Sequence, residues 1–205
     1  LRERGIDGLL GTNLLRLGAL AIDYDQKTIE VTDDVARLLP KEGASVAFTT
    51  SVQGAPYLAL GSGGKPIPRV LVDTGSNGYL QIPPTLLGEV PTERSLAVLG
   101  STTAGAFGKA REGASMVWLT GLSLGDQPLP GMVVMGQGDG EAHVGNRFFE
   151  RTRIVFDWRT SRFWVEAPAR LGRAQLRTHG LGLRHENGAV LVATVVTGSA
   201  AARSK

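Results

Sequence analysis

The chain has 205 residues, of which 42% are hydrophobic and 20% charged, as is typical of a globular protein with one sizeable core. Its 28 glycines and 10 prolines, set against 3 Trp and 3 Tyr, favour short strands and many turns over long helices. The net charge of +3 indicates no nucleic-acid partner, the lack of cysteine excludes disulfides, and no apolar run reaches the ~18 residues of a membrane span.

The N-terminal part of the chain predicts a helix, a β-hairpin and a connection. A short helix precedes two strands, over 19–23 and 28–31, that form a hairpin. The connection covers residues 32–44. It contains one helical turn near 35–39, which ends at Pro40 because proline restricts the residue before it.

Residues 45–167 predict a single lobe of short strands. A proline pair begins a helix that runs through Leu87, and a second helix near 146–151 precedes a hairpin over 153–166. The predicted strands are 56–61, 67–72, 79–82, 96–107, 114–119, 122–124 and 132–135. Short strands at this spacing, separated by Gly-rich turns, indicate a mostly β protein whose lobe is a small closed or nearly closed barrel.

The residues after the lobe divide into a linker and an incomplete module. Pro, Ala, Gly and Arg dominate 168–175, as in linkers. From 176 to 205 the pattern restarts with a strand at 181–183, an Asn-Gly turn, a strand at 190–196 and the start of a helix. Because ~30 residues bury too little apolar surface to fold alone, we expect the opening part of a further module. A hairpin extension of the barrel is the alternative.

A repeat joins the two ends of this region. Residues 9–31 and 143–165 share a pattern of apolar residues, Gly and Asp at a constant offset of 134 positions, the difference between 143 and 9. The matched pairs include Leu10 with Val144, Leu14 with Phe148, Asp23 with Asp157, Ile29 with Phe163 and Val31 with Val165. Such a repeat predicts a duplicated structural unit. We therefore expect residues 1–31 to be the tail of an upstream lobe, and the chain to be part of a longer protein.

One motif in the lobe carries chemistry. The sequence Asp73-Thr74-Gly75-Ser76 follows the apolar run 70–72, which predicts a buried strand that ends in a turn. Gly75 lets the backbone turn tightly, the Thr74 hydroxyl can brace the loop, and the short turn holds the Asp73 carboxylate at a cavity. We therefore predict Asp73 as a catalytic residue, with Thr74, Gly75 and Ser76 as its support.

This motif and its surroundings resemble the aspartic peptidases. The segment Asp-Thr-Gly-Ser-Asn-Gly-Tyr-Leu-Gln-Ile-Pro, from Asp73 to Pro83, resembles their active-site segment, and residues 144–166 are similar to the closing part of a retropepsin-like lobe. The resemblance covers about residues 45–167. It implies an endopeptidase in which one Asp from each of two lobes activates a water molecule against an extended polypeptide, without a metal or other cofactor.

The resemblance also sets what else the enzyme would need. Asp73 requires a partner lobe, and a second Asp-Thr-Gly is expected about 134 residues before it, by the offset of the repeat. The fragment alone is expected to be inactive. Asn146-Arg147 stands where relatives often carry Asn-Asp or Arg-Asp, so details of their cleft are not carried over.

A flap is a further expectation of the resemblance, because a β-hairpin covers the cleft in such enzymes. The best match is the Gly-rich stretch 103–109. An ordinary hairpin tip fits the same residues. The expected substrate contacts are Gly105, Ala106, Phe107 and Gly108.

Other polar residues are predicted to be structural. Asp23 and Asp157, equivalent in the repeat, precede aromatic residues at hairpin turns, where Asp side chains commonly bind the backbone. The 3 His residues lack the spacing of metal ligands, so no metal site is predicted.

The last segment resembles the beginning of a PDZ domain. Gly180, Leu181, Gly182 and Leu183 match the loop whose backbone N–H groups receive a C-terminal carboxylate in that family, although Leu183 stands where Phe is commonest. The resemblance implies a C-terminal peptide as a ligand.

Two other functions fit the sequence. A non-catalytic peptide-binding or adaptor protein would keep both modules but lack a second competent Asp. A one-lobed protease would obtain the partner Asp from a second copy in a homodimer, although the repeat at 9–31 favours an intrachain partner. Bacterial relatives that combine the two modules are often exported, which suggests the periplasm, the cell envelope or secretion.

Overall fold

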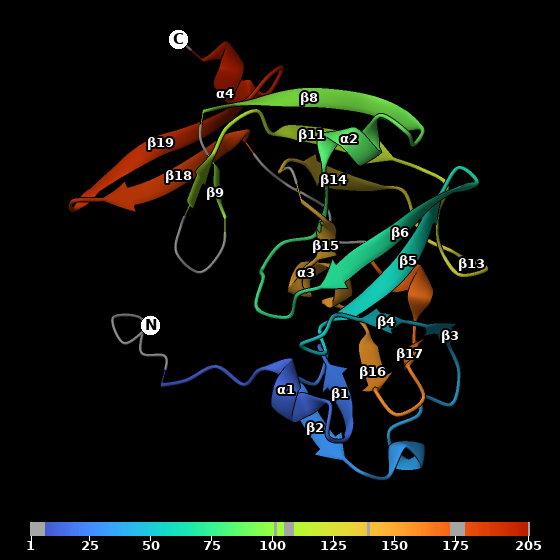
Figure 1. Cartoon of the computed structure of the whole chain (residues 1–205). Coiled ribbons are helices and arrows are strands. Elements are labelled where there is room, and N and C mark those ends of the chain that lie inside the picture. The colour runs from blue at the N-terminus through green and yellow to red at the C-terminus, as the bar shows by residue number, and fades with distance from the viewer. Residues whose placement is uncertain (1–6, 101, 105–108, 139, 173–178, 205) are drawn as a thin grey trace.

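The structure is a computed structural model that describes residues 7–100, 102–104, 109–138, 140–172 and 179–204. Strands dominate it, and the described helices have three or four residues each (Figure 1). The β-rich class predicted from composition and strand spacing is confirmed. None of the described helices is long and apolar enough to cross a membrane.

The elements follow the predicted order closely. The first are α1 (Thr12–Leu15), β1 (Ala19–Asp23), β2 (Thr28–Thr32), the 3-10 helix η2 (Val35–Arg37), β3 (Ala44–Ala47) and β4 (Thr49–Thr50). Next come β5 (Pro56–Ser62), β6 (Lys65–Val72), β7 (Leu80–Ile82), α2 (Pro84–Leu87), β8 (Thr92–Gly100), β9 (Thr102–Ala104) and β10 (Lys109–Arg111). They are followed by β11 (Ser115–Leu119), β12 (Leu122–Leu124), β13 (Gln127–Pro128), β14 (Met132–Gly136), β15 (Ala142–Val144) and α3 (Asn146–Phe149). The last are β16 (Arg153–Asp157), β17 (Arg162–Val165), the 3-10 helix η3 (Pro168–Arg170), β18 (Leu181–Glu186), β19 (Ala189–Val196) and α4 (Ala200–Arg203).

A five-stranded sheet joins the two copies of the repeat, in the order β2-β1-β16-β17-β3. The first copy contributes β1 and β2, and the second contributes the equivalent strands β16 and β17 (Figure 1). The strands β1 and β16 are antiparallel, with Ala19 opposite Asp157, Ala21 opposite Val155 and Asp23 opposite Arg153.

This register is symmetric with respect to the repeat. Adding the offset of 134 positions to Ala19 gives Arg153, and adding it to Asp23 gives Asp157. Exchanging the two copies therefore maps the β1–β16 pairing onto itself. Such a self-complementary contact has a local two-fold axis at its centre, which here lies between Ala21 and Val155.

Most other strands form one open sheet, in the order β13-β12-β5-β6-β15-β7-β14-β11-β8-β19-β18, with β4 paired to β5. The order does not return to its start, so the described residues do not form the closed barrel that the strand spacing predicted. The described residues of the predicted strand over 96–107 belong to β8 and β9, which lie in different sheets. Gly100, the last residue of β8, has a φ of +93° and lies so close to β19 that a Cβ there would be 2.2 Å from the Ala193 carbonyl oxygen.

The strand that leads to Asp73 lies inside this sheet. Strand β15 runs parallel to β6 and antiparallel to β7, and β7 runs parallel to β14. The loop 73–79 leaves β6 and returns as β7, with β15 between the two strands. The motif is therefore anchored by paired strands on both sides of the loop rather than at an edge of the sheet.

The two repeat copies differ in burial. Phe163 and Val165, in the second copy, each have 0% of their surface exposed and belong to the main core. Their equivalents in the first copy, Ile29 and Val31, are 70% and 51% exposed. The same apolar positions are thus covered by the lobe in one copy and uncovered, among the described residues, in the other.

The C-terminal hairpin extends the large sheet at one end (Figure 1). Strand β19 pairs with β8, with Thr194 opposite Gly100 and Val196 opposite Val98. This pairing corresponds to the hairpin extension that the sequence left as an alternative. The assignment of residues 176–205 to a truncated PDZ domain stays a prediction.

Candidate active site

Asp73 is the first residue after β6. Two residues of that strand, Val70 and Val72, are 0% and 6% exposed, whereas Asp73 is half-buried. The backbone N–H of Asp73 donates to the carbonyl oxygen of Val144 over 2.9 Å, which continues the parallel pairing of β6 with β15. Hydrogen bonds to β15 therefore fix the backbone as far as Asp73, and the Asp73 side chain lies where the buried strand ends.

The Asp73 carboxylate is held by its own loop. The Gly75 N–H donates to Asp73 Oδ1 over 3.0 Å, and the Ser76 N–H donates to the Asp73 carbonyl oxygen over 3.1 Å. A Cβ on residue 75 would lie only 3.2 Å from Asp73 Oδ1, so a side chain there would press on the carboxylate. The Gly78 N–H donates to Ser76 Oγ over 3.1 Å. These are side-chain turns of the kind that Asp and Ser favour, and they fix the direction of one carboxylate oxygen.

Asn146, the first residue of α3, also binds this loop. Asn146 Nδ2 donates to the Thr74 carbonyl oxygen over 2.8 Å, and the Asn146 backbone N–H donates to the Ser76 carbonyl oxygen over 2.8 Å. The residue before the helix is Gly145, where a Cβ would lie 2.6 Å from the carbonyl oxygen of Gly78. Within the described part of the chain, Thr74 is therefore bound through its carbonyl oxygen and not through the hydroxyl that the sequence suggested.

The first repeat copy reaches this loop through Tyr24. Its hydroxyl donates to Asn146 Oδ1 over 2.8 Å, and its ring stacks on Phe149 with the ring centres 6.1 Å apart. Burial raises the pKa of Tyr24 to about 12, so the hydroxyl keeps its proton at neutral pH. By the offset of the repeat Tyr24 is the equivalent of Trp158, but a single sequence holds no signal that joins Tyr24 to a residue 122 positions away.

The two aspartates of the repeat have the turn roles that the sequence predicted. Asp23 Oδ1 accepts from the Gln26 N–H over 2.8 Å, and Asp157 Oδ1 accepts from the Arg159 N–H over 3.0 Å. Among the residues that the structure describes, no group of three or more His, Asp or Glu side chains is placed to hold a metal ion.

The predicted flap contacts, Gly105, Ala106, Phe107 and Gly108, lie outside the described residues. The strands on either side of them, β9 and β10, pair antiparallel, with Ala104 opposite Lys109. A hairpin at this position agrees with the sequence. Its role as a flap stays a prediction.

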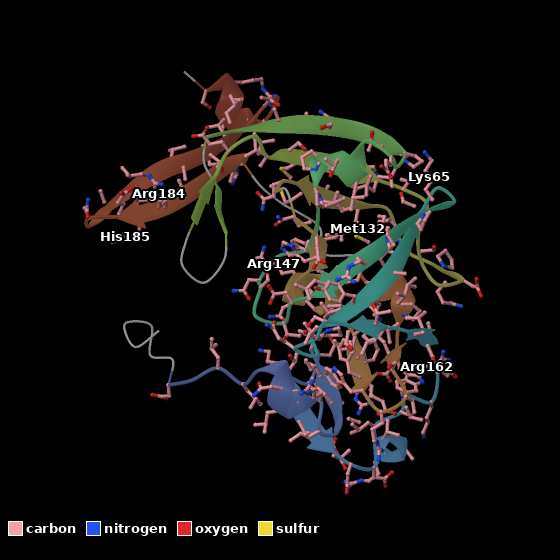
Figure 2. The ribbon with its side chains drawn as sticks, in the orientation of Figure 1. Lys65, Met132, Arg147, Arg162, Arg184 and His185 are labelled. Atoms are coloured by element: carbon pink, nitrogen blue, oxygen red, sulfur yellow. The ribbon has the colours of Figure 1, made fainter. Side chains whose placement is uncertain are left out.

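The predicted PDZ loop belongs to the C-terminal hairpin. Gly180 precedes β18 with a φ of +85°, and Leu181, Gly182 and Leu183 are the first residues of that strand. Figure 2 shows the following residues, Arg184 and His185, far along the hairpin and away from Arg147 of α3. The binding of a peptide by this loop is not tested by the structure.

Comparisons with known proteins do not assign the chain to a family. No family model matches it, and no curated protein matches it. Among solved structures it is similar to basic 7S globulin from soybean, with a TM-score of 0.39, 11% sequence identity, and coverage of 74% of this chain and 51% of that chain. The chain therefore spans about half the length of that protein. A likeness of this degree carries no argument about fold or function, so the proposals below depend on the residues of the chain alone.

Proposed function

We propose that this chain supplies one lobe and one catalytic carboxylate of a two-lobed aspartic endopeptidase. The lobe is residues 45–167, and the carboxylate is that of Asp73, held by the Thr74-Gly75-Ser76 loop. The second carboxylate comes from a lobe that packs on the first repeat copy as residues 45–167 pack on the second. The substrate is a polypeptide in extended conformation.

The observation that carries the proposal is the symmetric pairing of β1 with β16. A duplicated unit that pairs around a two-fold axis is expected to bear an equivalent lobe on each copy. Asn146 forms hydrogen bonds with both the Asp73 loop and Tyr24. Tyr24 is three positions from Ala21, which lies at the two-fold axis, and three residues span about 10 Å along a strand. A symmetric lobe would bring its own loop equally near the axis, where two carboxylates can share one water molecule.

The exposed side chains of the first copy also support a second lobe. Leu14 is 53% exposed and Ile29 is 70% exposed, whereas their equivalents Phe148 and Phe163 are 1% and 0% exposed. Burial of one such side chain is worth about 1.5–3 kcal/mol, so a lobe that covered this face would be held firmly. The first copy already pairs with β16 within the chain, which favours the intrachain arrangement over a one-lobed homodimer.

The proposed reaction needs one proton shared by two carboxylates, because two anions at close range repel each other. The ionised carboxylate accepts a proton from the bound water while the water oxygen bonds to the amide carbon. The carboxylic acid donates its proton to the carbonyl oxygen at the same time. The C–N bond then breaks as the nitrogen takes up the proton of the first carboxyl group, while a hydroxyl of the tetrahedral intermediate gives its proton to the second carboxylate and so restores the shared proton. The products are a new carboxyl terminus and a new amino terminus.

The substitution Asp73→Asn in the full-length protein tests the proposal. We expect it to abolish cleavage of an unfolded protein substrate with no change in the thermal unfolding temperature. An amide has the size of the carboxylate and still accepts from Gly75, but it cannot take a proton from water. Asp126→Asn, in an exposed hairpin turn, is the matched control and should keep full activity. Substantial cleavage by Asp73→Asn would reject the peptidase, and binding without cleavage by the wild type would favour the adaptor.

A further inference from the structure

A single peptide group joins the Asp73 carboxylate to α3. Its carbonyl oxygen, which belongs to Thr74, accepts a hydrogen bond from Asn146 Nδ2 over 2.8 Å. Its N–H, which belongs to Gly75, donates to Asp73 Oδ1 over 3.0 Å. Because a peptide group is planar, the hydrogen bond at its oxygen fixes the direction of its N–H on the opposite side.

Tyr24 fixes the orientation of the Asn146 amide. The Thr74 carbonyl oxygen can only accept, so the NH2 group of Asn146 must face it, and Asn146 Oδ1 must face the other way. The Tyr24 hydroxyl meets this oxygen over 2.8 Å and is the donor. Three hydrogen bonds then point in the same direction, from Tyr24 through Asn146 to Asp73, and each polarises the next.

We infer that Tyr24 and Asn146 are positioning residues, which hold the Asp73 carboxylate in the direction that catalysis needs. The inference rests on the proposed function and adds a link between the two halves of the molecule. Tyr24 belongs to the first repeat copy, whereas Asn146 and Asp73 belong to the lobe that the second copy closes. The packing of the first copy against this lobe therefore completes the loop that carries the carboxylate.

The residues that are equivalent to Tyr24 and Asn146 in the repeat form different hydrogen bonds. The offset of 134 positions makes Trp158 the equivalent of Tyr24, and Thr12 the equivalent of Asn146. Trp158 Nε1 and Thr12 Oγ1 donate to carbonyl oxygens of the turn at 53–54, over 2.9 and 3.1 Å. The tyrosine-to-amide link thus exists in one half only, and the two carboxylates of the proposed dyad differ in their support.

The substitution Tyr24→Phe in the full-length protein removes the hydroxyl and keeps the ring that stacks on Phe149. We expect kcat for peptide cleavage to fall about tenfold and KM to change less than about twofold, because one hydrogen bond is lost and the substrate contacts are unaffected. The acidic limb of the pH profile of kcat should move to higher pH, because the ionised carboxylate loses part of the chain of hydrogen-bond donors that stabilises it. Tyr57→Phe is the matched control, since its hydroxyl donates to Glu141 Oε2 over 2.7 Å, and it should change none of these.

Hydrogen exchange at the Gly75 amide gives a readout that does not depend on activity. We expect faster exchange at Gly75 in Tyr24→Phe and no change in Tyr57→Phe. If Tyr24→Phe has the same kcat, pH profile and Gly75 exchange rate as the wild type, the inference is overturned. That result does not affect the proposed function, which Asp73→Asn tests separately. Activity retained by Asp73→Asn would instead remove the proposed function, and Gly75 exchange would then decide alone whether Tyr24 holds the loop.

Discussion

Ala21 and Val155 lie opposite each other at the centre of the β1–β16 pairing, and they are the same position of the repeat, 134 residues apart. The pairing is therefore symmetric. The burial of the apolar side chains is not symmetric, because those of the second copy are covered by the lobe and several of those in the first copy are exposed. A molecule with symmetric pairing and unequal burial should respond unequally to substitutions at equivalent positions.

Ile29 and Phe163 provide a matched pair for this response. In the 205-residue chain, Phe163→Ala is expected to lower the free energy of unfolding by about 3–5 kcal/mol, because the ring is fully buried. Ile29→Ala should lower it by less than about 0.5 kcal/mol, because the side chain is mostly exposed. Urea unfolding of both variants measures the difference.

The same substitution at Ile29 should behave differently when the proposed second lobe is present. If that lobe covers the face of the first copy, Ile29→Ala is expected to cost about 2–4 kcal/mol in the full-length protein. A cost as small as in the 205-residue chain would mean that no lobe covers this face.

Local patterns predicted most of the strands, and tertiary contacts decided the rest. Leu122–Leu124 was predicted with its observed bounds, and the hairpin over 153–166 is present as β16 and β17. The strand Ala142–Val144 was not predicted from the sequence. It is a strand because β6 and β7 bind it on either side, and that pairing comes from residues far away in the sequence.

The substitution Gly145→Ala is expected to damage the Asp73 loop. A Cβ would lie 2.6 Å from the Gly78 carbonyl oxygen and 2.7 Å from the Ser76 carbonyl oxygen, and both are backbone atoms of the loop. We expect a loss of about 1–3 kcal/mol in urea unfolding, together with lower activity of the proposed peptidase, since the loop must shift. Gly140→Ala, where a Cβ meets nothing within 4 Å, is the control and should be neutral. Equal stability of the two variants would contradict the packing of the loop against α3.

The candidate site could be predicted only in part. The place of Asp73 and Gly75 in a turn after a buried strand could be predicted, because an apolar run followed by turn residues is a pattern of consecutive residues. Asn146 entered the sequence analysis only as part of the pair Asn146-Arg147, which differs from the Asn-Asp or Arg-Asp of relatives. Its contact with Thr74 depends on the place of β15 between β6 and β7, which brings the start of α3 beside the loop. Contacts of this kind follow from topology and have no periodic signal in the sequence.

Tyr24 should also make stability depend on alkaline pH. Burial raises its pKa from 10.0 to about 12, so the folded state holds the proton more tightly than the unfolded chain does. This contribution is fully present below pH 10.0 and is lost as the pH rises through about 12. The loss is as much as about 2–3 kcal/mol, at about 1.4 kcal/mol for each pKa unit.

The substitution Tyr24→Phe tests this pH dependence. The variant lacks the hydrogen bond to Asn146 and should be less stable than the wild type at neutral pH. It also lacks the titrating hydroxyl, so it should lose less stability as the pH rises to about 12. Urea unfolding of both proteins over this pH range measures the two slopes. Parallel slopes would show that the Tyr24 hydroxyl is not buried in the folded protein.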